Sequence, residues 1–147
     1  MNRMPQRGFT LVEILIVVVI LGILAAVVVP QFSSATQDSK LRATLSQLHH
    51  LRNAMSVYSV QHSGRYPTVR EGPGTWGELI TLGYLKRRPT NNWVGGANAT
   101  VITLADSPDA AYHQSYGWVF AVDGAPSGTP EVWAAGFTGD DQPLFPD

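Results

Sequence analysis

The sequence predicts an α+β fold in which one long N-terminal helix packs on a small antiparallel β-sheet. An almost unbroken apolar run covers residues 9–29, and an amphipathic helical pattern continues over residues 41–58. Short segments rich in β-branched and aromatic residues follow only after residue 100. A helix followed by separate strands is typical of the α+β class, and 147 residues suffice for one such domain besides the apolar segment.

The apolar run is long enough to cross a membrane, yet it contains one acidic residue, Glu13. As a helix, residues 9–29 would span about 32 Å at ~1.5 Å per residue, which matches the hydrocarbon thickness of a bilayer. A carboxylate there costs roughly 2.5 to 3.5 kcal/mol on insertion scales. No Lys, Arg or His occurs between Gly8 and Gln37. We therefore expect the partner of Glu13 to come from outside this helix.

Two general interpretations of the N-terminal segment leave Glu13 unexplained. A secretory signal peptide fits the basic residues Arg3 and Arg7 and a small-residue cleavage site at residues 33–35, but the apolar stretch is longer than usual. A plain signal anchor fits the arginines, which would stay in the cytoplasm. Neither secretion nor anchoring requires an acidic side chain at the leading edge of the apolar run.

A third interpretation comes from residues 7–13, Arg-Gly-Phe-Thr-Leu-Val-Glu. This stretch resembles the processing site of type IV pilins and type II secretion pseudopilins, most of all the major pseudopilins. The resemblance implies that prepilin peptidase cleaves between Gly8 and Phe9 and that the new N-terminal Phe9 is N-methylated. It also implies that the Phe9 amine of one subunit pairs with Glu13 of its neighbour. Such a buried pair would set register more than it adds net stability.

The pattern predicts that the helix continues well beyond the apolar run. Gly22 and Pro30 interrupt that run, and we expect a kink near Pro30 because proline removes a backbone hydrogen bond. Residues 9–62 would form one helix of about 80 Å at ~1.5 Å per residue, ended by Gly64 and Pro67. Its second half carries an apolar stripe on one face, formed by Leu41, Leu45, Leu48, Leu51, Met55 and Tyr58.

A short second helix is expected after a Gly- and Pro-rich loop at residues 63–74. Thr75 and Glu78 have the spacing of a capping box, and Gly83 marks the end of the helix. The sequences GRYPT at residues 64–68 and TWGELITLGYL at residues 75–85 also resemble the segment that follows the long helix in pseudopilins.

Three strands complete the expected fold. The last two are separated by an eight-residue loop and suggest a hairpin, so we expect an antiparallel sheet packed on the apolar stripe. The predicted strands are residues 100–105, 115–122 and 131–137.

Composition excludes several classes of function. A net charge of −1 gives no basic surface for nucleic acid, and the chain has no cysteine for disulfides or thiol chemistry. His49 and His50 are adjacent, so they point in different directions on a helix and are expected to be solvated. No pattern brings a catalytic triad together. The tryptophans form either core or a sugar-stacking face, and core is favoured in so small a domain: Trp76, Trp93, Trp118 and Trp133.

One metal site is implied by the resemblance alone. Major pseudopilins bind calcium in a loop near the C-terminal sheet, and the candidates here are Asp140 and Asp141, with Asp147 at the end of the chain. Calcium takes six to eight oxygen ligands, whereas no loop of this sequence shows regular ligand spacing. Type IV pilins often close the C-terminal loop with a disulfide, so the absence of cysteine favours a pseudopilin.

The resulting interpretation is a non-enzymatic filament subunit with three regions. Residues 1–8 form a leader, residues 9–30 a transmembrane and assembly helix, and residues 31–147 a pilin-like head in the periplasm or at the cell surface. The resemblance implies membrane lipid before assembly, and as partners prepilin peptidase, a methyltransferase, an assembly platform with its ATPase, and other pilin subunits. The alternative is a secreted or membrane-anchored ligand-binding module with a tryptophan-rich head.

Overall fold

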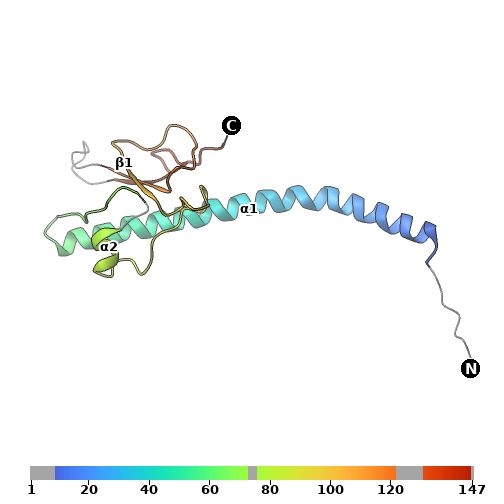
Figure 1. The fold of residues 1–147 in the computed structure, drawn as a ribbon, viewed down its shortest axis with the longest axis horizontal. Helices are drawn as coiled ribbons and strands as arrows, with labels where there is room; N and C mark the ends of the chain where they lie inside the picture. Colours follow the sequence, from blue (N-terminus) through green and yellow to red (C-terminus); the bar gives the residue numbers. More distant parts are fainter. Residues whose placement is uncertain (1–8, 73–75, 122–130, 147) are drawn as a thin grey trace, which may run out of the picture. The chain divides into compact units, whose positions relative to one another are not determined.

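The computed structural model describes residues 9–72, 76–121 and 131–146, without the side chain of Pro30. Its elements follow the order expected of an α+β fold, so the predicted fold class is confirmed (Figure 1). They are the helices α1 (Leu11–Gln61) and α2 (Gly77–Thr81) and the strands β1 (Ile102–Leu104), β2 (Trp118–Phe120) and β3 (Val132–Ala134).

The long N-terminal helix is confirmed, and both its ends lie within two residues of the prediction. α1 has 51 residues and continues through Gly22 and Pro30, while the kink near Pro30 stays a prediction. It ends where Gly64, at φ +84°, donates its amide to the carbonyl of Ser59, since glycine adopts this left-handed conformation at little cost. The chain divides into two compact units, Met1–Gln37 (unit 1) and Asp38–Asp147 (unit 2).

The sheet of unit 2 has the strand order β1-β2-β3. β2 and β3 pair antiparallel, with Trp118 opposite Ala134, as the hairpin prediction required; the loop at residues 123–130 lies outside the described residues. β1 pairs parallel with β2, so the prediction of a fully antiparallel sheet is wrong. The reason is the long connection between Leu104 and Trp118, which matches the dozen or so residues that a parallel crossover needs.

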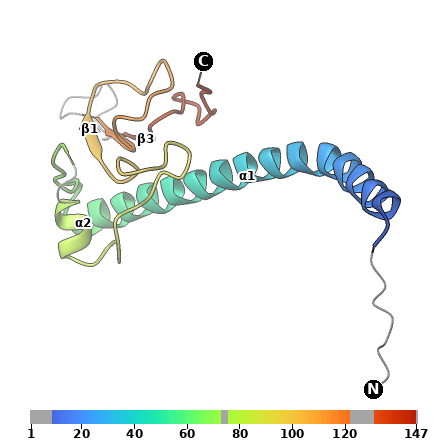
Figure 2. The same ribbon diagram turned by 45° about the vertical axis from the view of Figure 1, so that its right-hand side comes forward.

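The sheet packs on the part of α1 that belongs to unit 2 (Figure 2). The predicted stripe is confirmed, because its last four members are buried and Leu41 and Leu45 are partly buried against the same core. Trp76 and Trp118 are buried in this core and Trp93 packs against it, while Trp133 is buried outside this cluster. The Trp76 and Trp118 rings meet edge to face with their centroids 6.1 Å apart.

One fully buried polar side chain, Asn91, ties the strands together. Its amide nitrogen donates to the carbonyl oxygens of Gly117, just before β2, and Ala135, just after β3, both at 2.8 Å. Three-residue strands form few ladder hydrogen bonds, so these two bonds hold the β2–β3 pair at the end where the ladder stops.

The other end of the same amide reaches α1. The Asn91 side-chain oxygen accepts the backbone amides of Trp93 at 3.0 Å and Val94 at 3.1 Å, and it lies 3.3 Å from the hydroxyl of Thr44. The Thr44 hydroxyl oxygen also accepts the Trp93 amide at 3.0 Å. Asn91 therefore joins the helix, the loop that follows Pro89 and the ends of β2 and β3.

Replacing Asn91 should be among the most destabilising single changes in unit 2. Asn91→Ala would remove the bonds that the Ala135 carbonyl and the Val94 amide make to this side chain, whereas the Trp93 amide keeps Thr44 and the Gly117 carbonyl keeps the Ala135 amide. Two buried polar groups without a partner should cost at least about 2 kcal/mol. Urea unfolding of the purified chain measures this cost. The half-buried neighbour offers a matched control, and Asn92→Ala should cost less than about 1 kcal/mol. Equal losses for the two variants would contradict this role of Asn91.

Glu78 in α2 fastens the loop that follows α1. Its carboxylate accepts hydrogen bonds from Arg65 at 2.8 and 3.2 Å and from the Thr68 backbone amide at 3.1 Å. Arg65 also donates to the hydroxyl of the buried Tyr58. The expected capping box assigned a different role to Glu78; its first member, Thr75, lies outside the described residues.

This network predicts a pH dependence of folding. The hydrogen bond from Arg65 is the main cause that lowers the Glu78 pKa to about 2, and bonds from Tyr58 and Thr68 add to it. A lowered folded-state pKa contributes stability above the unfolded value near 4.5, and this contribution disappears as the pH falls toward 2. Melting temperatures should therefore be higher for the wild type than for Glu78→Gln at pH 7 and converge near pH 2. A constant difference across this range would argue against the network.

Candidate assembly segment

The start of α1 is built by Thr10 and Glu13, which cap the helix reciprocally. The Thr10 hydroxyl oxygen accepts the backbone amide of Glu13 at 3.2 Å. In return, Oε2 of Glu13 accepts the Thr10 amide at 3.2 Å and the Thr10 hydroxyl at 3.1 Å. This is a capping box, which satisfies amides that the first turn of a helix leaves without acceptors.

The capping box is a feature of Glu13 that was not predicted from the sequence. Thr10, immediately before α1, supplies hydrogen-bond donors, and the Thr-x-x-Glu spacing was the sequence signal that could have revealed them. The donors are neutral, however, so the negative charge stays uncompensated by any cation in the part of the chain that the structure describes. Within the same residues only Oε2 is bonded, and Oε1 is open to a further donor.

Phe9 precedes the capping box and lies outside the helix. It is 82% exposed, and the chain before it, including Gly8, lies outside the described residues. Cleavage between Gly8 and Phe9 and methylation of Phe9 therefore remain predictions. A free amine on Phe9 would stand next to Thr10, whose amide and hydroxyl already point to Glu13.

The rest of unit 1 exposes apolar side chains on every face. The large hydrophobic residues between Phe9 and Phe32 are between 41% and 82% exposed, and none of the most apolar stretch is buried within the chain. The helix is long and apolar enough to span a membrane. Exposed apolar surface of this extent indicates contact with lipid or with other protein.

Gly22 has no packing role inside unit 1. A Cβ atom built on it would meet nothing within 4 Å, so the chain's own fold does not require glycine there. Small residues on apolar helices let neighbouring helices approach closely. Pro30 has a helical backbone within α1, and the predicted roles of Gly22 and Pro30 in assembly stay predictions.

The two aspartates expected to bind calcium do not fit such a site. Asp140 is exposed, whereas Asp141 forms an ion pair with Arg52 at 2.6 Å. Among the residues the structure describes, no group of three His, Cys, Asp or Glu side chains is arranged to hold a metal ion. His49 and His50 are exposed as expected and belong to no such group, whereas Asp147 lies outside the described residues.

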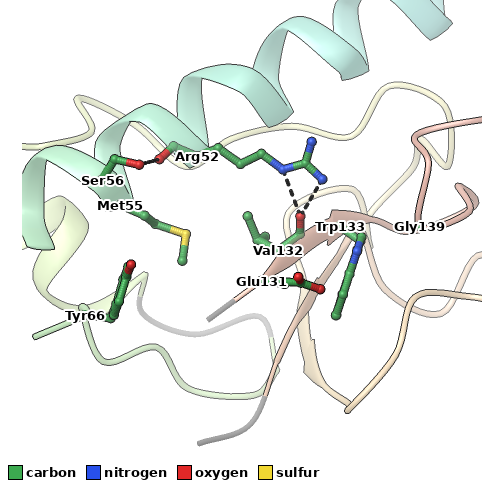
Figure 3. Close-up of a pocket in the computed structure, with 8 residues that line it drawn as sticks. All are labelled: Arg52, Met55, Ser56, Tyr66, Glu131, Val132, Trp133 and Gly139. Atoms are coloured by element: carbon green, nitrogen blue, oxygen red, sulfur yellow. Dashed lines mark hydrogen bonds between the residues drawn. The ribbon is translucent and has the colours of Figure 1, made fainter. Parts of the chain in front are cut away.

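A cavity of about 400 Å³ lies beside the same ion pair (Figure 3). Arg52, Met55 and Ser56 contribute from α1, and the guanidinium of Arg52 points toward the carbonyl of Val132 in β3. Trp133 is the one tryptophan among the lining residues, and only 5% of it is exposed. The cavity is therefore not the tryptophan-rich binding face that the alternative interpretation required. The other lining residues are Tyr66, Glu131, Val132 and Gly139.

Comparisons with known proteins agree with the chemistry of this segment. Residues 3–29 match the family described as "Prokaryotic N-terminal methylation motif". Three relatives named "Type II secretion system core protein G" are each 36% identical to this chain. The protein of Klebsiella michiganensis aligns over 65% of this chain and 73% of its own length, that of Pseudomonas aeruginosa over 63% and 72%, and that of Escherichia coli over 60% and 67%. No solved structure matches the chain.

Proposed function

Because this chain belongs to the family of type II secretion system core protein G, we propose that it builds a pseudopilus through its N-terminal helix. It is a structural subunit of such a filament, in keeping with the N-terminal methylation motif. The function is mechanical, and the subunit carries out no reaction of its own.

Processing would prepare the subunit for assembly. Prepilin peptidase removes residues 1–8 on the cytoplasmic side of the inner membrane, and a methyltransferase modifies the amine of Phe9. The apolar surface of residues 9–30 holds the subunit in the membrane, with the following residues in the periplasm. An assembly platform and its ATPase then draw the helix out of the lipid into a filament of pilin subunits.

The observation that carries this proposal is the capping box at the start of the apolar, exposed part of α1. Before assembly, neutral donors bind Oε2 of Glu13 and keep the first turn closed. In the filament, the Phe9 amine of a neighbouring subunit approaches Oε1 and supplies the cation that the box lacks. The charge is then paired where it would otherwise be buried alone, which fixes the axial position of each incoming subunit.

Close packing of helices would complete the contact. Gly22 leaves a notch on the helix surface, into which a neighbouring apolar helix can fit. The same apolar side chains that face lipid before assembly then face other subunits. Their surroundings are apolar in both states, so little apolar surface is gained from or lost to water. Assembly of such helices depends on register and shape more than on the hydrophobic effect.

Variants of Glu13 separate the capping role from the charge. Glu13→Gln retains a side-chain oxygen for the Thr10 donors but removes the charge. We expect normal membrane insertion and cleavage, and a loss of filaments of several hundred-fold, because an unpaired buried amine costs roughly 3 to 5 kcal/mol. Glu13→Ala should behave alike, and Glu13→Asp more mildly because it keeps the charge. Processing is read by gel mobility and filaments by shearing and electron microscopy.

Thr10→Val is the matched control for these variants. It removes the hydroxyl of the capping box and leaves the carboxylate, so it should cost about 1 kcal/mol of helix stability and reduce filaments far less than Glu13→Gln. Normal filaments from cleaved Glu13→Gln subunits would show that the charge has another purpose. Stronger loss in Thr10→Val than in Glu13→Gln would assign Glu13 to capping alone.

A substitution at Gly8 tests processing directly. The proposed scissile bond follows this residue, and a protease cleft that accepts glycine there should have little room for a side chain. Gly8→Leu should therefore accumulate the unprocessed form, with a mass larger by that of residues 1–8, and should yield no filaments. Mass spectrometry of the N-terminus gives the result, and methylated Phe9 is expected from the wild type. Maturation of Gly8→Leu at the same bond would refute the assignment of the site.

A further inference from the structure

Arg52 connects α1 to the C-terminal turn of the chain. Its Nη1 and Nη2 atoms donate to the two carboxylate oxygens of Asp141 at 2.6 and 2.9 Å. Its Nε and Nη2 atoms also donate to the backbone carbonyl of Val132 in β3, at 3.3 and 3.0 Å (Figure 3). One guanidinium thus joins a helix, a strand and a turn, and its paired bonds to a carboxylate have the strongest geometry available to an ion pair.

The backbone at Asp141 supports a specific role for its side chain. Asp141 has φ +57°, a left-handed conformation that is unfavourable for residues with a Cβ, although Asp and Asn tolerate it best. The turn is closed by the Asp141 amide, which donates to the Thr138 carbonyl at 3.1 Å, and by the Thr138 amide, which donates to Gln142 at 2.9 Å. Glycine would fit this turn without strain, but only a carboxylate provides the bond to Arg52.

The segment after this turn is also held by the protein itself. The indole of Trp93 donates to the Leu144 carbonyl at 2.9 Å, and its ring lies edge to face with Phe145, with centroids 5.3 Å apart. The Leu144 amide donates to Gly136 at 2.8 Å. The C-terminal segment is therefore attached on both sides of Pro143, once through an ion pair and once through an aromatic residue.

We infer that the Arg52–Asp141 ion pair fixes the C-terminal segment in place of a divalent cation, so that the stability of unit 2 does not depend on calcium. A guanidinium bonded to both oxygens of Asp141 places a positive charge where a calcium ion would have to bind, and the two cations repel each other. Asp140 is exposed beside it, and among the described residues no three acidic or histidine side chains are arranged to hold a metal ion. Calcium requires at least six oxygen ligands.

The test uses the purified full-length chain in detergent, melted with millimolar calcium chloride or with EGTA. The wild type should have the same melting temperature in both. Asp141→Asn keeps a residue that tolerates the left-handed backbone but removes the charge, and it should lower the melting temperature by about 4 °C. Arg52→Gln should lower it further, since it also loses the bonds to Val132. The double variant should have the melting temperature of Arg52→Gln, because Arg52→Gln alone already removes the ion pair.

Asp140→Asn is the matched control, and it should leave the melting temperature unchanged in both buffers. If calcium stabilises the wild type by several degrees and Asp140→Asn abolishes this gain, the inference is wrong. An Asp141→Asn variant as stable as the wild type would also refute it. Should Asp141→Asn fail to fold, Arg52→Lys keeps the charge without the paired bonds, and a wild-type melting temperature for it would count against the inference. Filaments are not measured, so these outcomes leave the proposed function untouched.

Discussion

The fold of unit 2 depends on the buried side-chain amide of Asn91. Three strands of three residues each form too few ladder hydrogen bonds to be stable alone. Asn91 adds bonds at Gly117 and Ala135, where the ladder stops, and a contact to Thr44 in α1. Because the same amide serves both the sheet and the helix, the sheet can pack on α1 in only one register. The buried stripe of α1 and the tryptophans then fill the space that this arrangement defines.

The two parts of α1 meet opposite requirements with one continuous backbone. In unit 1 the side chains are apolar on all faces and exposed, which suits lipid or neighbouring helices of the same kind. In unit 2 one face is buried and the other is polar, so water is tolerated along its outer side. The change from one pattern to the other falls near Gln37, where the two compact units divide.

The sequence predicted the features that repeat along the chain and missed those made by single residues far apart. The helix and its stripe have a periodicity that can be counted, the three strands are marked by β-branched and aromatic residues, and the tryptophans are buried for reasons of size. Asn91, and the pair of Arg52 and Asp141, join residues dozens of positions apart and leave no local pattern. The parallel pairing of β1 was missed because strand patterns do not state direction. The Thr10–Glu13 capping box, in contrast, has a local signal in the sequence, the Thr-x-x-Glu spacing.

Glutamate at position 13 is explained best by two demands that apply in succession. A capping box accepts glutamate or glutamine, because either supplies an oxygen to the donors at the N-cap. In lipid the uncharged residue would even be preferred, since a carboxylate raises the cost of insertion. Of these two residues, only glutamate can also neutralise the positive amine that processing would create on Phe9. Its second carboxylate oxygen, Oε1, accepts no hydrogen bond from the described residues and could accept one from that amine. In the proposed function, the cost of the charge in the membrane would be the condition for pairing in the filament, and the capping box would reduce that cost before assembly.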